Sequence, residues 1–225
     1  MQAEDMASDQ RHQVLYVADS KKQVIHCVKL GSSDHGQWTV GQKPCGLSVA
    51  FDSGNLLVSC GETRRLVEFS AKGNILRNFP ICGVVAVYHA ITLQGGQVVA
   101  SVGVGKQDPP LYRVCYIDSD GKKGHGFSAN LPGFTLVGPG HLAAVVGDEN
   151  SGQVLVGDCN GPRVVLLSTA LTNMRVVATR NHGLRRVGRL SLDPITRRFY
   201  VADNAPGEGD CGGGSRSGRV MVFSL

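Results

Sequence analysis

The chain of 225 residues carries 23 basic and 18 acidic side chains, a formal net charge of +5, and 42% of its residues are hydrophobic. This composition excludes a globally disordered chain, and the length allows one large all-β domain or two small ones. No apolar run approaches the roughly 20 residues that span a bilayer, and the polar N-terminus lacks the apolar core of a signal peptide, so we expect no membrane contact.

Cysteine usage and the distribution of charge bear on compartment and partner. The seven cysteines are an odd number and contain no C-x-x-C pair, which favours reduced thiols in the cytoplasm and excludes zinc-finger spacing. Residues 160–225 hold ten arginines, no lysine and four acids. Such a region either binds an anionic partner such as nucleic acid or is a solvated surface with arginine in its turns.

Five short apolar runs, rich in Val and Leu, recur along the chain. They end at positions 19, 60, 102, 158 and 203, so that successive ends are 41, 42, 56 and 45 residues apart. A period near 40–45 residues built from short strands is typical of propeller blades. The runs are Leu15–Asp19, Leu56–Cys60, Val98–Val102, Val154–Asp158 and Phe199–Asp203. The sequence therefore predicts an all-β propeller of four-stranded blades.

Each run is the second strand of a predicted blade. Inner strands precede the runs, at a short polar segment around Met6 and at Gly46–Phe51, His89–Leu93, His141–Val146 and Arg189–Leu192. Third strands follow them, at Val24–Leu30, Leu66–Ser70, Val114–Ile117, Val164–Leu167 and Val220–Phe223. Outer strands are clearest at Asn74–Phe79 and Met174–Ala178. No stretch shows a sustained helical period.

These units give one predicted propeller domain over residues 1–225. Their approximate boundaries are 1–42, 43–82, 83–136, 137–183 and 184–225. The last unit stops after its third strand, so either five blades close with help from the N-terminus or the chain is part of a six-bladed ring. We expect an incomplete ring of about five visible blades, with an exposed sheet edge that lowers solubility.

The second unit carries a recognisable motif, in Pro44–Val49 (PCGLSV), Gly54–Ser59 (GNLLVS) and Arg65–Phe69 (RLVEF). It resembles the NHL repeat, and the whole chain resembles the C-terminal propellers of invertebrate tripartite-motif-like proteins. That resemblance implies six blades and a top face that binds protein or single-stranded RNA. The RING and B-box patterns of those proteins are absent from this sequence, so ubiquitin-ligase activity is not expected.

Arginine recurs just before the third strand, and the first unit has Gln23 there. The Asp residues that end three of the second strands belong to the same face. Two interpretations stay open: Arg–Asp or Arg–carbonyl contacts that tie each turn, or a set of guanidinium groups that binds phosphate or acidic peptide. The first is favoured, because a repeat keeps its structural residues. The arginines are Arg65, Arg113, Arg163 and Arg219.

His89 and His141 start adjacent inner strands and are expected to point toward the mouth of the channel, with Tyr88 beside them. Histidines from successive blades are used in the related amidating-lyase propeller, but the set is interrupted here by Gly46 and by Gly188 or Arg189. The inner strands also lack the Glu that gluconolactonase-like propellers use. We therefore predict no metal, no cofactor and no catalytic residue.

The sequence prediction for function is a non-catalytic scaffold. Its top face would bind a protein partner through Arg65, Arg113, Arg163, Arg219 and the three channel residues. Single-stranded RNA is the alternative partner, although aromatic residues for base stacking are only 6% of the chain. A metal-dependent lyase or lactonase is the least favoured alternative.

Overall fold

The computed structural model describes residues 2–50, 52–106, 110–118, 123–127, 136–138, 140–145, 152–193, 195–204 and 218–225. Contacts between residues divide the chain into two compact units, Met1–Ser128 (unit 1) and Ala129–Leu225 (unit 2). Whether all five blades make up a single domain stays a prediction.

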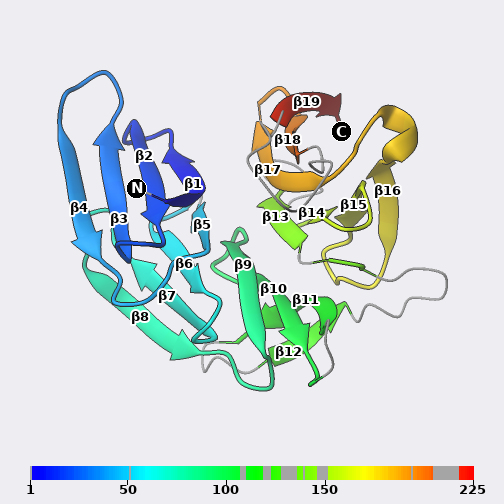
Figure 1. The fold of residues 1–225 in the computed structure, drawn as a ribbon, viewed down its shortest axis with the longest axis horizontal. Coiled ribbons are helices and arrows are strands. Elements are labelled where there is room, and N and C mark those ends of the chain that lie inside the picture. Colours follow the sequence, from blue (N-terminus) through cyan, green and yellow to red (C-terminus); the bar gives the residue numbers. More distant parts are fainter. Residues whose placement is uncertain are drawn as a thin grey trace, which may run out of the picture. The chain divides into compact units, whose positions relative to one another are not determined.

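Unit 1 contains three antiparallel sheets, each with four strands in chain order (Figure 1). Blade 1 comprises β1 (Ala3–Asp9), β2 (Val14–Asp19), β3 (Val24–Lys29) and β4 (His35–Thr39). Blade 2 comprises β5 (Gly46–Val49), β6 (Leu56–Cys60), β7 (Arg65–Phe69) and β8 (Ile75–Pro80). Blade 3 comprises β9 (Ala86–Thr92), β10 (Val98–Val104), β11 (Leu111–Ile117) and β12 (Lys123–Phe127).

Unit 2 contains the other two sheets that the structure describes. Blade 4 comprises β13 (Gly140–Ala144), β14 (Val154–Asp158), β15 (Arg163–Leu167) and β16 (Met174–Ala178). Blade 5 comprises β17 (Val187–Asp193), β18 (Arg198–Asn204) and β19 (Gly218–Ser224). The single helical element of the described residues is the three-residue 3₁₀ turn η1 (Arg180–His182).

The predicted fold class is confirmed: the protein is an all-β propeller built of antiparallel blades. The six blades that the NHL resemblance implies are not seen, because the described residues form five sheets. The first inner strand is longer than its weak apolar signal suggested, since β1 runs from Ala3 to Asp9. The ends of two predicted inner strands, Phe51 and Val146, lie outside the described residues.

The apolar strands are buried on both faces because blades pack against one another within each unit. All five residues of β6 and all seven of β10 are buried. In unit 1, Tyr16 and Ile25 of blade 1 share an apolar cluster with Phe69 of blade 2. In unit 2, Leu155 of blade 4 shares an apolar cluster with Phe199 of blade 5. This packing explains why the second strands are continuous runs of Val and Leu rather than alternating ones.

A β-bulge recurs near the start of several inner strands. The register of β1 shifts between Ala3 and Asp5, and that of β17 shifts between Val187 and Arg189. In β9 the extra residue is Tyr88, because Val87 pairs with Val102 while His89 pairs with Ser101. A bulge bends the strand locally and re-aims the side chain that follows it. The residues re-aimed in this way include Asp5 and His89.

Candidate functional site

The upper end of a blade is the end where its second strand stops and its third strand begins. In blade 4 this end is closed by Asp158, whose side chain is completely buried. Its Oδ1 accepts the backbone N–H of Gly138 at 3.0 Å and of Gly161 at 3.2 Å. Its Oδ2 accepts the Nε and Nη2 groups of Arg163 at 3.1 and 2.9 Å. A buried carboxylate is stable when it is paired and hydrogen-bonded in this way.

Blade 5 repeats the arrangement with Asp203 and Arg219. The backbone N–H groups of Arg185 and Arg186 each donate to Asp203 Oδ1 at 2.8 Å, and Arg219 Nε donates to Oδ2 at 2.8 Å. Arg219 also donates to the carbonyl of Gly183. Burial alone would raise the pKa of Asp203, but the hydrogen bonds from Arg186, Arg185 and Arg219 outweigh it and hold the pKa below its ordinary value.

The corresponding arginines of unit 1 face residues that carry no charge. Arg65 pairs with Cys60 in the strand register, and Arg113 pairs with Val102. Burial raises the pKa of the Cys60 thiol to about 12, so it stays neutral and cannot replace a carboxylate. Within the described part of the chain, neither guanidinium group has an ion pair, and the buried Nε of Arg113 has no hydrogen-bond partner.

Blade 1 differs from both patterns. The register places Val24, not Gln23, opposite Asp19, because Gln23 is the left-handed turn residue (φ 57°) just before the strand. Asp19 Oδ1 accepts the backbone N–H groups of Lys21 and Lys22 at 3.1 Å. Its Oδ2 lies 3.6 Å from Nε2 of His26, a residue that the sequence analysis did not single out. Burial alone would raise the pKa of Asp19, but the backbone N–H groups of Gln2 and Lys22 and the nearby His26 side chain outweigh it and hold the pKa below its ordinary value.

Tyr88, the bulge residue of β9, contacts β11 of the same blade. Its ring centroid is 5.7 Å from that of Tyr112, the residue before Arg113, and the two rings are tilted by 56°. The Tyr88 hydroxyl also approaches Gly103, where an added Cβ would lie 3.3 Å away. The aromatic ring that the sequence placed beside His89 therefore packs on the upper part of its own blade.

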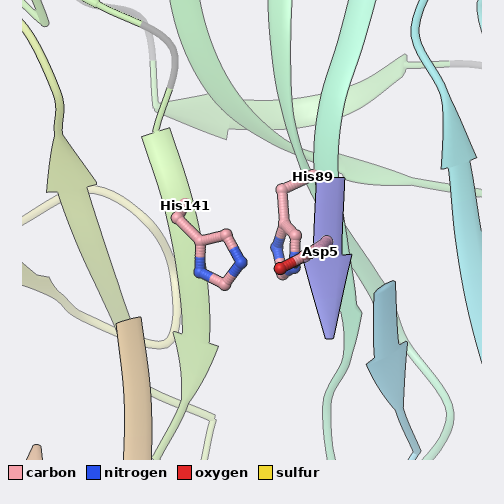
Figure 2. A group of neighbouring side chains, drawn as sticks. All are labelled: Asp5, His89 and His141. Atoms are coloured by element: carbon pink, nitrogen blue, oxygen red, sulfur yellow. The ribbon is translucent and has the colours of Figure 1, made fainter. Parts of the chain in front are cut away.

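The inner strands of unit 1 bring together Asp5 and His89, whose side chains are each about 3% exposed. Asp5 Oδ2 lies 3.6 Å from His89 Nε2, and Figure 2 shows the carboxylate directed at the imidazole ring. Leu47 of blade 2 contacts both groups: its N–H donates to Asp5 Oδ2 at 2.8 Å, and its carbonyl lies 3.0 Å from His89 Nε2. Three blades of unit 1 thus meet at one buried polar cluster.

Gly46 makes room for this cluster. An added Cβ at Gly46 would lie 2.8 Å from Cδ2 of the His89 ring and 2.5 Å from Oγ of Ser59, both closer than real contacts allow. The glycine that interrupts the histidine set is therefore required by packing. It lets the imidazole of His89 reach across blade 2.

His141 belongs to unit 2, on β13. Its Nδ1 accepts the backbone N–H of Leu190 at 3.2 Å, a hydrogen bond that joins blade 4 to blade 5. In a neutral imidazole this leaves the proton on Nε2. Strand register gives equivalent inner positions to Asp5, Gly46, His89, His141 and Arg189.

Comparison with known proteins gives the fold and no family. No protein-family model matches the chain, and no curated protein matches it in sequence. A Bacteroides caccae protein of unknown function has a similar structure, with 16% identity and a TM-score of 0.69 over 99% of this chain and 77% of that chain. At such identities the likeness shows the propeller fold alone.

Two enzymes are among the similar structures. Virginiamycin B lyase from Staphylococcus aureus is 10% identical, with a TM-score of 0.62 over 99% of this chain and 70% of that chain. Hydrazine synthase of Kuenenia stuttgartiensis is 14% identical, with a TM-score of 0.61 over 89% of this chain. This chain spans 61% of the hydrazine synthase chain.

Proposed function

We propose that the chain is a non-catalytic binding module of the NHL type, which recognises acidic side chains of a protein partner at the upper ends of blades 2 and 3. The observation that carries the proposal is the absence of a carboxylate opposite Arg65 and Arg113, where Cys60 and Val102 stand. In blades 4 and 5 the same position holds Asp158 and Asp203.

The energetics of burial support this proposal. A buried donor without an acceptor costs about 1–3 kcal/mol, and Arg113 Nε is such a donor in the described residues. A partner carboxylate supplies the missing acceptor and can take two hydrogen bonds from one guanidinium group.

Peptide selection tests the proposal without a known partner. A random peptide library is selected on the full chain and counter-selected on the Arg65→Gln/Arg113→Gln variant. We expect the recovered peptides to be enriched in Asp and Glu, and their affinity for the double variant to fall at least about tenfold. Peptides without acidic enrichment, or equal affinity for both proteins, would contradict the proposal.

The matched control removes two arginines elsewhere. Arg197 and Arg198 are exposed at the turn between β17 and β18. Arg197 has a left-handed backbone (φ 54°), which glutamine already adopts at Gln13. The Arg197→Gln/Arg198→Gln variant loses the same charge and should bind the selected peptides as the wild type does.

Single-stranded RNA is the second candidate partner, and an arginine-rich segment of unit 2 favours it. Arg185, Arg186 and Arg189 are exposed, and the first two are held at the upper end by their backbone bonds to Asp203. If these arginines contact phosphates, affinity for oligouridine should fall steeply as salt rises. Salt-independent binding, or the same affinity in Arg185→Gln/Arg186→Gln, would reject RNA.

The compartment is part of the same proposal. The described cysteines are all free, and we propose a cytoplasmic location because reduced thiols persist there. Among the described residues, no helix has the length and apolar character needed to cross a membrane.

A further inference from the structure

The buried cluster on the inner strands of unit 1 has no part in the proposed function. We propose that Asp5, His89 and the carbonyl of Leu47 bind a divalent transition-metal ion such as Zn²⁺. The ion would join blades 1, 2 and 3 and stabilise unit 1. This inference is independent of acidic-peptide binding at the upper ends of blades 2 and 3.

The donor atoms lie close to the spacing that bound metal ligands have. Two donors bound to one Zn²⁺ at about 2.1 Å lie roughly 3.0–3.4 Å apart, depending on the coordination geometry. His89 Nε2 lies 3.6 Å from Asp5 Oδ2 and 3.0 Å from the Leu47 carbonyl oxygen. A carboxylate oxygen has two lone pairs, so Asp5 Oδ2 can keep the Leu47 N–H bond while it binds the ion.

Two other Asp–His pairs in unit 1 show what sets this one apart. His12 Nδ1 lies 2.6 Å from Asp9 Oδ2, a direct hydrogen bond, and the His12 side chain is 57% exposed. His26 lies 3.6 Å from Asp19 and is 24% exposed. The Asp5–His89 pair combines the wider spacing with burial of both partners. Burial of a charged carboxylate is costly, and a bound cation offsets that cost.

Binding changes the tautomer of His89. In the competing arrangement, His89 Nε2 carries a proton and donates it to the Leu47 carbonyl. The metal ion takes the Nε2 lone pair instead, and the imidazole stays neutral with its single proton on Nδ1. The two arrangements predict different behaviour toward added metal, so they can be separated.

The experiment uses the full chain, freed of metal with a chelator and titrated with ZnCl₂. We expect one high-affinity site per chain and a melting temperature raised by about 5–10 °C when zinc exceeds its dissociation constant a hundredfold. Co²⁺ added in place of Zn²⁺ should give a spectrum without a thiolate charge-transfer band, because no cysteine is among the proposed ligands.

Two variants keep the test independent of misfolding. Asp5→Asn keeps the shape and an acceptor for the Leu47 N–H, and His89→Gln keeps a donor for the Leu47 carbonyl. Each should lower zinc affinity at least about a hundredfold while the metal-free protein still unfolds cooperatively. His12→Gln is the matched control and should bind zinc normally. Absence of stoichiometric zinc binding, or unchanged affinity in both variants, would overturn the inference.

Discussion

The upper ends of the blades in unit 2 and the upper ends of blades 2 and 3 differ by one residue type. Blades 4 and 5 carry a buried Asp at or next to the end of the second strand, and that Asp accepts hydrogen bonds from an Arg of the third strand. Blades 2 and 3 keep the Arg but have Cys60 and Val102 at the position of the Asp. The same arginine is therefore a structural residue where its carboxylate is present and a candidate binding residue where it is missing.

The largest expected effect on stability comes from removing the buried carboxylate at the upper end of blade 4. Asp158→Ala leaves Arg163 and several backbone N–H groups, including that of Gly138, without their acceptor. We expect the free energy of unfolding to fall by about 3 kcal/mol in urea titrations. A loss below about 1 kcal/mol would mean that these contacts do not hold the blade end together.

The upper end of blade 2 can be given the carboxylate that it lacks. Cys60→Asp places a carboxylate opposite Arg65, as Asp158 lies opposite Arg163. A double-mutant cycle with Arg65→Met should give a coupling free energy of about 1–3 kcal/mol. The cycle would count against the comparison if Cys60→Asp were equally destabilising with and without Arg65. Acidic peptides should also bind Cys60→Asp more weakly.

Acid should reduce the stability that the buried Asp at the upper end of blade 5 contributes. The pKa of Asp203 is lower in the folded chain than its ordinary value near 4, so its contribution to stability is complete above that value and is lost as pH falls through the lowered one. The urea midpoint should hold steady from pH 7 to 5 and decline below about pH 4. In Arg219→Met the decline that Asp203 causes should be smaller, because a hydrogen bond that lowers its pKa is gone.

The smallest expected effect concerns the reactivity of the Cys60 thiol at the upper end of blade 2. The pKa of Cys60 is raised to about 12 and its side chain is buried, whereas Cys82 is exposed. Iodoacetamide at pH 8 should modify Cys82 and leave Cys60 intact, as measured by peptide mass spectrometry. Modification of Cys60 at the rate of Cys82 would show that it reacts as a thiolate, which could pair with Arg65.

The sequence predicts the blades well because the second strands are buried on both faces and carry a strong apolar signal. The predicted outer strand Met174–Ala178 agrees with β16. The first inner strand gave a weak signal, because AEDMASD places charged residues in the strand itself. Asp5 was missed for that reason, since its burial depends on Leu47 and His89, which lie 42 and 84 positions further along the chain.

The periodicity of the sequence does not predict the role of each of the four arginines. Their recurrence predicted a common structural role, and the contacts of Arg163 and Arg219 agree with that role. For Arg65 and Arg113 the deciding feature is the cross-strand neighbour, and that neighbour follows from register. A one-residue error in register also put Gln23 where Val24 stands.

The comparison is tested most directly by the unfolding free energies of two double variants, measured in urea under identical conditions. Arg163→Met/Arg219→Met leaves two buried carboxylates without their cations, and we expect a loss of about 4 kcal/mol. Arg65→Met/Arg113→Met removes two arginines that have no acidic partner in the described residues, and we expect a change within about 1 kcal/mol. Equal losses in the two variants would contradict the division of these arginines into structural and binding residues.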